Sequence, residues 1–550
     1  MKIFQRILVV ALIALIAFFG YQWFMKPKKM IEPNDVTQIV LVTEDQLIQV
    51  SYPEEDINGL LSAGWIPQTL LEAYHIYADY DAEEDMVTVS DGDNLLRYDI
   101  TYGTATLNGE TIVMEKPKTQ NGELWLPLSG INEYFGLLYD GNIDGKTMFV
   151  KSEDVVYALA NLVSDTDLKA EVNNERILKE LVEGESVIVF PFNDEYSYVM
   201  TADYQVGYVR SEALGTLTVM GEKLDQDTTL EDKVFLTWEI YGRGYDTGKI
   251  GEMKGVNVIS PAWYALSDDA GNFTSKASEN YLSWAKSRDY EVWALVSNDF
   301  KVDRTSTFLH SATSRRNFIE NLLAEYIKMG YDGVNIDFEN VYKEDKRQLT
   351  QFVAELTSEF RRAGLTVSMD VTVKGGSDTW SKCYDRKALG HVIDYMAVMT
   401  YDEHWASSPI SGSVASYNWV KSGIEDIMED VPSQKLLLGI PYYMRVWTEV
   451  PSLERSNAMD VKSGVLNMPN AENFIKEKNL NLIWDEKARQ YYAGYIEDGK
   501  LKKIWFENGA SIKEKASLVN ELNLGGAAVW RRGFETQDIW SIIDNEMNSK

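Results

Sequence analysis

The chain has 550 residues, of which 45% are hydrophobic and 12% aromatic, so its length predicts about three or four domains with substantial cores. Its 53 basic and 85 acidic residues give a formal charge of -32, which argues against binding nucleic acid or adhering broadly to anionic surfaces, whereas a neutral polymer remains a compatible partner. Cys383 is the single cysteine, so no intramolecular disulfide can form, and no Cys/His cluster has zinc spacing. The sequence therefore predicts no metal and no other cofactor.

Residues 1–30 predict a membrane anchor. Lys2 and Arg6 precede an apolar run over residues 7–24, and Lys26 follows it. A run of about 18 residues is just long enough to cross the hydrocarbon core as a helix. No small-x-small cleavage site follows the run, which favours an uncleaved signal anchor over a removed signal peptide. The flanking basic residues nearly balance, so charge leaves the orientation open.

Residues 31–154 are strand-like and rich in turns. Alternating runs stand beside turn dipeptides at 87–93, 105–110 and 121–128, and a short helix is expected over 129–135. This pattern resembles the β-rich stalk module first named from the amino-terminal domain of copper amine oxidases. The resemblance implies a spacer, with cell-wall contact as a second role, and no copper chemistry.

Residues 165–222 predict a second small β domain. Runs at 185–190, 198–201 and 206–209 indicate three short strands joined by tight polar loops. They resemble a bacterial Src-homology-3-like module, in which the Gly-Tyr-Val strand is the most regular feature. Such modules often bind cell-wall peptides, and a plain spacer is an equally open reading.

Residues 228–550 alternate apolar strand candidates with helices, which is the rhythm of a parallel TIM (β/α)8 barrel of the α/β class. The eight expected strands are 234–238, 256–260, 292–296, 334–338, 366–371, 395–399, 436–440 and 526–530. The interval between strands seven and eight is too long for one loop and one helix. A small α+β insertion is expected there, at about 447–520, with a hairpin that turns at Asp498-Gly499.

The fourth strand carries the most informative stretch of the barrel. A helical pattern ending at Gly330 precedes it, and Val334, Ile336 and Phe338 then alternate with polar residues on the other face. Helices cover the outside of such a barrel, so the polar face must point into the barrel or a cleft, where buried carboxylates are costly unless paired or used. A surface strand with a solvated acidic face is the alternative.

That polar face resembles a known family. Asp332, Asn335, Asp337 and Glu339 match the D-x-x-D-x-D-x-E signature of family 18 glycoside hydrolases, the chitinases and N-acetylglucosaminidases, with Asn at the second Asp and Gly333 inside the motif. The resemblance implies that Glu339 protonates the glycosidic oxygen and Asp337 orients the substrate's 2-acetamido group. The acetamido oxygen then attacks the anomeric carbon, so no enzyme carboxylate acts as nucleophile.

Asn335 departs from the signature. An amide there is expected to donate a hydrogen bond to Asp337 and hold it ionised. Asn335 is also a candidate for contact with the substrate. The proton donor itself is present, which favours a working enzyme over a binding protein.

Further matches follow later strands. Tyr401 and Asp402 stand in the family's M-x-Y-D, and Arg445 in a stretch similar to P-x-Y-G-R-x-W, where Met444 replaces the Gly. The resemblance implies that Tyr401 holds the acetamido carbonyl as a catalytic residue, that Asp402 and Arg445 bind the sugar, and that Trp530 forms the hydrophobic floor beneath it.

Other aromatic and polar residues near strand ends are weaker candidates. We expect two of four tryptophans to stack on sugars in the cleft; the four are Trp238, Trp263, Trp293 and Trp405. Asp370 is a candidate polar wall. His404 is more simply a loop histidine with its hydrogen bonds satisfied.

The leading hypothesis is a glycosidase that cuts β-1,4 bonds next to N-acetylglucosamine in peptidoglycan or a chitin-like polysaccharide. We expect a single-pass protein of the cell membrane with its bulk outside the cell, where wall glycans lie; secretion after cleavage and a cytoplasmic orientation are alternatives. A non-catalytic glycan-binding protein on the same barrel is the second hypothesis. A metal-dependent hydrolase using Asp332, Asp337, Glu339 and Asp402 is the third.

Overall fold

The computed structural model describes residues 36–43, 47–53, 59–141, 147–153, 155–172, 177–191, 194–220, 233–240, 246–452 and 459–549. The chain divides into two compact units, one drawn from 1–66, 119–123 and 136–222, the other from 67–118, 124–135 and 223–550. The predicted anchor, residues 1–30, lies outside the described residues. Across the ranges given above, no helix is both long and apolar enough to cross a membrane.

The first unit consists of two sheets. The smaller has the order β11-β12-β1-β2, with β1 and β12 parallel, from β1 (Val36–Val42), β2 (Leu47–Pro53), β11 (Leu137–Gly141) and β12 (Thr147–Ser152). The larger has the order β15-β14-β18-β17-β16-β13-β19, from β13 (Tyr157–Asn161), β14 (Thr166–Lys169), β15 (Ile177–Leu181), β16 (Ser186–Pro191), β17 (Tyr196–Thr201), β18 (Val206–Arg210) and β19 (Thr218–Met220).

The three strands predicted between 185 and 209 are confirmed as β16, β17 and β18, which pair antiparallel in succession. Their assignment to a Src-homology-3-like module stays a prediction. Three short strands lie where the chain passes between the units: β3 (Trp65–Pro67), β9 (Lys118–Gln120) and β10 (Glu123–Pro127). The helix predicted over 129–135 is wrong, because only the 3-10 turn η2 (Leu128–Gly130) forms there.

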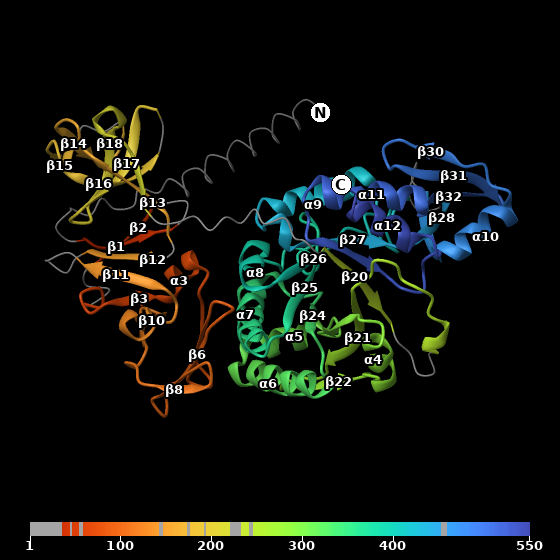
Figure 1. Ribbon diagram of the computed structural model, residues 1–550, viewed down its shortest axis with the longest axis horizontal. Coiled ribbons are helices and arrows are strands. Elements are labelled where there is room, and N and C mark those ends of the chain that lie inside the picture. The colour runs from red at the N-terminus through yellow and green to blue at the C-terminus, as the bar shows by residue number, and fades with distance from the viewer. Residues whose placement is uncertain are drawn as a thin grey trace, which may run out of the picture. The chain divides into compact units, whose positions relative to one another are not determined.

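The second unit contains the predicted barrel (Figure 1). Its eight parallel strands match the eight predicted: β20 (Val234–Glu239), β21 (Val258–Leu266), β23 (Glu291–Ser297), β24 (Gly333–Asp337), β25 (Thr366–Thr372), β26 (Tyr395–Met399), β27 (Leu436–Pro441) and β33 (Gly526–Trp530). The barrel closes because β20 pairs with both β21 and β33. The short strand β22 (Phe273–Ser275) adds an antiparallel partner to β21.

Helices surround these strands in Figure 1. They are α4 (Glu279–Lys286), α5 (Val302–His310), α6 (Ala312–Met329), α7 (Lys346–Arg362), α8 (Arg386–Val392), α9 (Tyr417–Met428), α11 (Gly509–Glu521) and α12 (Ile539–Met547). The predicted helix before the fourth strand is α6, and it ends at Gly330, whose φ of 73° is the left-handed conformation that glycine adopts at helix ends. The 3-10 turns η4 (Thr247–Lys249), η5 (Lys343–Asp345) and η6 (Ser433–Lys435) join other elements.

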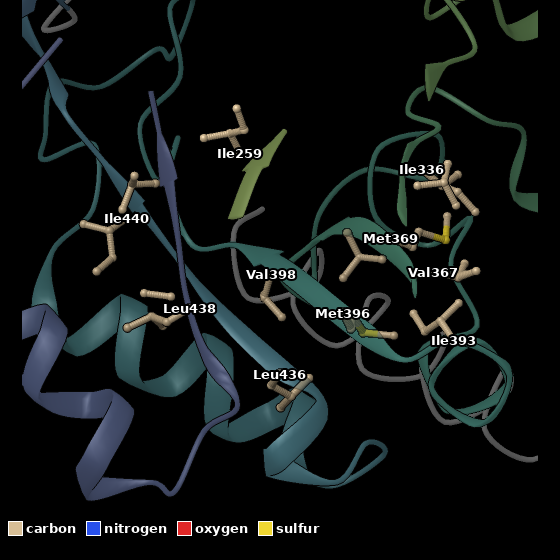
Figure 2. Packing of buried hydrophobic residues seen from close by; sticks show 14 of the residues in the cluster. Ile259, Ile336, Val367, Met369, Ile393, Met396, Val398, Leu436, Leu438 and Ile440 are labelled. Carbon is tan, nitrogen blue, oxygen red and sulfur yellow. The ribbon is translucent and has the colours of Figure 1, made fainter. Parts of the chain in front are cut away.

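The alternation of side chains along each strand separates two apolar layers. Val334 and Ile336 of β24, and Phe338 just after it, pack in the layer between strands and helices. Figure 2 shows part of this layer, with Ile336, Val367, Met369, Met396, Val398, Leu438 and Ile440 on β24 to β27. The barrel interior holds a separate cluster that includes Trp238, Trp293 and Leu437. Asn335 and Asp337, which alternate with Val334 and Ile336 along β24, therefore face the interior.

The predicted insertion is an antiparallel sheet of order β29-β28-β32-β31-β30 with one helix. Its elements are β28 (Tyr443–Pro451), β29 (Met459–Asn467), α10 (Met468–Lys478), β30 (Ile483–Asp485), β31 (Gln490–Glu497) and β32 (Lys500–Phe506). The predicted hairpin is the β31–β32 pair, with Asp498 and Gly499 at positive φ in its turn. The insertion begins directly after β27, a few residues earlier than predicted.

Part of the stretch predicted as a spacer belongs to the same unit as the barrel. Residues 67–118 contain α3 (Gln68–Leu71), η1 (Glu72–Tyr74) and a meander of β4 (Tyr77–Asp81), β5 (Met86–Ser90), β6 (Leu95–Asp99), β7 (Thr104–Leu107) and β8 (Glu110–Ile112). The β7–β8 turn is Asn108-Gly109, both at positive φ, as a two-residue hairpin requires.

This meander packs on helices α6 and α7 through buried polar contacts. Arg315 of α6 is fully buried and donates to Glu355 Oε1 at 3.0 Å and to Asp79 Oδ2 of β4 at 3.0 Å. Thr88 of β5 donates to the same Glu355 oxygen at 2.8 Å, and Ser90 bonds Ser358 at 2.8 Å. Because one arginine joins two carboxylates away from water, the meander is a fixed part of the barrel's surface rather than a free spacer.

Replacing Arg315 by methionine should lower the free energy of unfolding by about 3–5 kcal/mol, because Glu355 would stay buried without its cation. Urea denaturation followed by tryptophan fluorescence measures this. Arg316→Met is the matched control, because Arg316 is 53% exposed and pairs only with Glu320 on the same helix. The control should change stability by less than about 1 kcal/mol. Equal small losses in both variants would contradict a stabilising role for the buried network.

Candidate active site

The two acids predicted to be catalytic lie at the carboxyl end of β24. Asp337 is the last residue of the strand and pairs in register with Ser297 of β23, and Glu339 lies two residues later. Asp332 lies at the other end, where its Oδ2 accepts from the Val292 N–H at 2.7 Å and its carboxylate pairs with Lys286. Asp332 therefore links neighbouring strands and does not share the site with Glu339.

Gly333, the motif's glycine, has a steric reason to be there. A Cβ at this position would lie 2.6 Å from the Thr366 carbonyl oxygen and 2.7 Å from the Trp293 ring. A side chain would push β24 away from β25, so the glycine is structural.

Asn335 lies inside the barrel, fully buried, with its hydrogen-bonding capacity used. Its Oδ1 accepts from Trp238 Nε1 and Ser260 Oγ, both at 2.9 Å. Its Nδ2 donates to Ser368 Oγ at 3.1 Å and to Asp370 Oδ1 at 2.7 Å. The prediction that this amide donates to Asp337 is therefore wrong, and Asn335 supports the floor of the site from below rather than facing a substrate.

Asp370, which was expected to be a polar wall of the site, lies beneath the site and is hydrogen-bonded to Asn335. It is 2% exposed, and its Oδ2 accepts from Trp238 Nε1 at 3.1 Å. Burial raises the pKa of Asp370 well above its usual range, and the charge of Asp337 raises it further, although the Asn335 hydrogen bond favours ionisation. Asp370 is thus shifted toward its protonated form.

Burial, reinforced at Glu339 by electrostatic repulsion, shifts the pKa values of the two catalytic candidates. Burial raises the pKa of the Asp337 carboxyl. Burial, followed by the negative charges of Asp337 and Asp402, raises the pKa of Glu339. Glu339 therefore holds its proton at neutral pH, as a general acid must. Asp337 Oδ1 is buried and has no hydrogen-bond partner among the described residues, so an acceptor is available there.

Asp402 and Arg445, each predicted to bind the sugar, contact one another and share a partner that the sequence did not reveal. Arg445 Nη2 donates to Asp402 Oδ1 at 3.2 Å, and Tyr443 donates to the same oxygen at 2.7 Å. Tyr401 lies beside them, its ring 6.3 Å from that of Tyr443. Tyr443 occupies the tyrosine of the P-x-Y-G-R-x-W stretch but was missed, because nothing in the sequence links it to Asp402. Its neighbour Tyr442 packs in the core.

The aromatic candidates separate by burial. Trp238, Trp263 and Trp293 are at most 2% exposed, so the expectation that Trp238 stacks on a sugar is wrong. Trp238 instead packs 6.0 Å from the ring of Trp530, which is only half-buried. Trp405 is 50% exposed and remains a candidate platform.

The structure also bears on His404 and on the hypothesis of a metal-dependent hydrolase. A His404 ring nitrogen bonds the Ser413 carbonyl at 2.8 Å, as expected for a loop histidine. In the part of the chain that the structure describes, no three His, Cys, Asp or Glu side chains are placed to hold a metal ion. The proposed donor set also fails because Asp332 lies at the opposite end of β24 from Glu339.

A second residue that sequence reasoning missed is Asn298, which follows β23 and is fully buried. It bonds the main chain of Glu339 on both its N–H and its carbonyl. An asparagine just after the strand that neighbours the acid is the only signal that could have found it.

Comparison with known proteins agrees with this geometry. The family described as Glycosyl hydrolases family 18 matches residues 235–535, and the Copper amine oxidase N-terminal domain matches residues 68–150. The spore cortex-lytic enzyme SleL of Bacillus cereus, a solved structure, has a TM-score of 0.50 at 20% identity, covering 67% of this chain and 90% of that one. At this identity the likeness concerns the fold alone.

Two curated relatives are similar in sequence. The uncharacterized glycosylase YvbX of Bacillus subtilis is 27% identical over 322 residues, which cover 54% of this chain and 89% of that protein. The cortical fragment-lytic enzyme of Bacillus anthracis is 27% identical over 253 residues, covering 45% of this chain and 57% of the enzyme. Because the family match extends over more than half of the 550 residues and contains the acids of β24, this chain belongs to glycosyl hydrolase family 18 and is a glycosidase.

Proposed function

We propose that this glycosidase cuts β-1,4 bonds next to N-acetylglucosamine in a bacterial wall glycan, with retention and with help from the substrate's own acetamido group. One observation carries the proposal. Glu339, kept protonated by burial and by neighbouring charges, lies two residues from Asp337, which has a buried acceptor oxygen without a partner among the described residues.

The reaction proceeds in two steps. Glu339 gives its proton to the glycosidic oxygen while the acetamido oxygen attacks the anomeric carbon and the bond to the leaving sugar breaks. Asp337 Oδ1 accepts the acetamido N–H, which orients the group and disperses the positive charge that develops on it. Water, deprotonated by the Glu339 carboxylate, then opens the oxazoline-like intermediate, so the anomeric configuration is retained.

Side chains around the acids bind the sugar. The Tyr401 hydroxyl donates a hydrogen bond to the acetamido carbonyl, and the half-buried Trp530 presents an apolar face to the pyranose. Asp402, held by Tyr443 and Arg445, binds sugar hydroxyls and adds charge near Glu339. Trp405, exposed in the following loop, extends the cleft for a longer chain.

The relatives indicate the class of substrate, and the sequence indicates the location. Relatives named for lysis of cortical fragments favour a bacterial wall glycan over foraged chitin. The apolar run at residues 7–24 would tether the chain to the cell membrane with its barrel outside the cell. Membrane fractionation combined with protease treatment of intact cells tests this; a full-length chain found soluble in the cytoplasm would refute the tether.

Glu339→Gln should lower kcat on purified peptidoglycan and on N-acetylglucosamine oligomers by about 10²–10⁴-fold, because an amide cannot protonate the leaving oxygen. KM should change little, since glutamine keeps the shape of the side chain. Mass analysis of the products measures turnover and identifies the cleaved bond. Glu403→Gln is the matched control in a neighbouring loop, where the Glu403 carboxylate only accepts from the Ser416 N–H. Absence of turnover by the wild type on either glycan would favour a glycan-binding role.

Asp337→Ala tests the substrate-assisted step separately. The variant should lose activity on substrates that carry the 2-acetamido group, because that group is no longer oriented for attack. An unchanged rate would refute the participation of the acetamido oxygen, while leaving Glu339 as proton donor intact.

The plot of kcat/KM against pH should be bell-shaped. The pKa values that define its two limbs should both lie above the usual range for exposed carboxylic acids. Asp337 acts charged, so activity falls as pH drops through its raised pKa. Glu339 acts protonated, so activity falls as pH rises through its raised pKa. Asp402→Asn removes one of the charges that raise the Glu339 value and should move the alkaline limb to lower pH. Asp378→Asn, at an exposed acid paired with Lys382, is the control. An alkaline limb unmoved by Asp402→Asn would contradict this electrostatic coupling.

A further inference from the structure

The main chain at Glu339 is held by a side chain of the neighbouring strand. Register pairing between β23 and β24 ends at Ser297 and Asp337, so Glu339 has no ladder partner on β23. The Asn298 side chain bonds the main chain of Glu339 in place of a ladder partner. Its Oδ1 accepts from the Glu339 N–H at 3.1 Å, and its Nδ2 donates to the Glu339 carbonyl at 2.7 Å.

The amide of Asn298 is fully used. Besides its two bonds to Glu339, its Oδ1 accepts from the Phe300 N–H at 3.2 Å and its Nδ2 donates to Thr305 Oγ1 at 3.0 Å. An amide offers two N–H donors and two acceptor lone pairs, so all four positions are filled. The orientation of the amide is also determined, because a main-chain N–H can only donate and a carbonyl can only accept.

Two further contacts join the same loops. Asn340 Nδ2 donates to the Phe300 carbonyl at 3.1 Å, and the Tyr342 hydroxyl donates to Asp303 Oδ1 at 2.6 Å. Both are at the surface, whereas Asn298 is fully buried. The buried amide is therefore the contact that water competes with least, and it acts on the residue that carries the acid.

We propose that Asn298 is a positioning residue for the proton donor: its amide fixes the main chain of Glu339 and so the place from which the Glu339 carboxyl protonates the glycosidic oxygen. The proposal rests on the proposed function, in which Glu339 is that donor. Proton transfer depends steeply on the separation and angle of donor and acceptor, so a shift of the main chain weakens this step more than it weakens binding.

The alternative is that Asn298 merely stabilises the loop. The two readings differ in how activity depends on the leaving group. A strongly acidic phenol leaves without help from a proton, whereas a weakly acidic phenol or a sugar needs one. A defect in positioning the acid therefore appears only with poor leaving groups, whereas a general loss of structure lowers every rate alike.

The test uses the full-length enzyme and a series of aryl glycosides of an N-acetylglucosamine disaccharide whose phenols differ in acidity. Asn298→Ala should lower kcat on the least acidic phenol by about ten- to a hundredfold, and on the most acidic by less than about threefold, with KM nearly unchanged. Asn298→Asp keeps both acceptor contacts but faces the Glu339 carbonyl with an oxygen, and should shift the leaving-group dependence in the same direction.

Asn257 supplies the matched control, because its side-chain amide also bonds main-chain groups of another segment, at the opposite end of the barrel. Its Oδ1 accepts from the Phe235 N–H at 2.8 Å, and its Nδ2 donates to the Lys233 carbonyl at 2.9 Å. Asn257→Ala should lower the melting temperature and leave the dependence on the leaving group as in the wild type.

Equal losses on every phenol in the Asn298 variants, or no loss, would overturn the proposal, as would failure of both variants to fold. Glu339→Gln in the same series separates this outcome from a failure of the proposed function. If Glu339→Gln does not steepen the dependence, Glu339 is not the proton donor. If it does, and the Asn298 variants do not, only the role of Asn298 is refuted.

Discussion

Burial of several carboxyl groups at one end of the barrel, together with the repulsion among them, is the constraint on which the site depends. Asp337, Glu339 and Asp370 are each shifted by burial toward the protonated form, and the charge of Asp337 raises the pKa of both Glu339 and Asp370. Such a group cannot ionise as a whole, because each new charge meets the previous one in a medium of low polarity. Glu339 is thereby kept protonated beside Asp337, and substrate-assisted hydrolysis uses a protonated acid beside a charged one.

Neutral groups hold these acids in place. The Asn335 amide and the Trp238 N–H bond Asp370, and the Asn298 amide bonds the main chain of Glu339. A lysine or arginine at these positions would stabilise the carboxylates and abolish the raised pKa of Glu339. Asp402 does have a cation, Arg445, and a phenol, Tyr443, as partners. Asp402 lies farther out than the buried acids and is exposed.

Sequence patterns predicted the barrel well. Its eight strands bury one face against helices, and this burial leaves a period-two pattern in the sequence. The acids of β24 were found because they are adjacent in sequence. Contacts between strands were missed or misread. Asn298 carries no pattern, and nothing in the sequence links Tyr443 to Asp402. Trp238 was interpreted as a sugar platform, and Asn335 was assigned the wrong partner. The packing of the β4–β8 meander on α6 and α7 was likewise not predicted, since nothing in the sequence pairs Arg315 with Glu355 and Asp79.

The sequence by itself determined the order of strands, the position of the acids at a strand end and the absence of a disulfide, because these depend on local periodicity and residue type. Only the tertiary structure decided which side chains meet. Whether a tryptophan stacks on sugar or supports an amide, and whether an arginine is solvated or joins two carboxylates, depends on contacts between segments far apart in the chain. Those contacts follow from closure of the barrel, which places the ends of distant strands within hydrogen-bonding distance of one another.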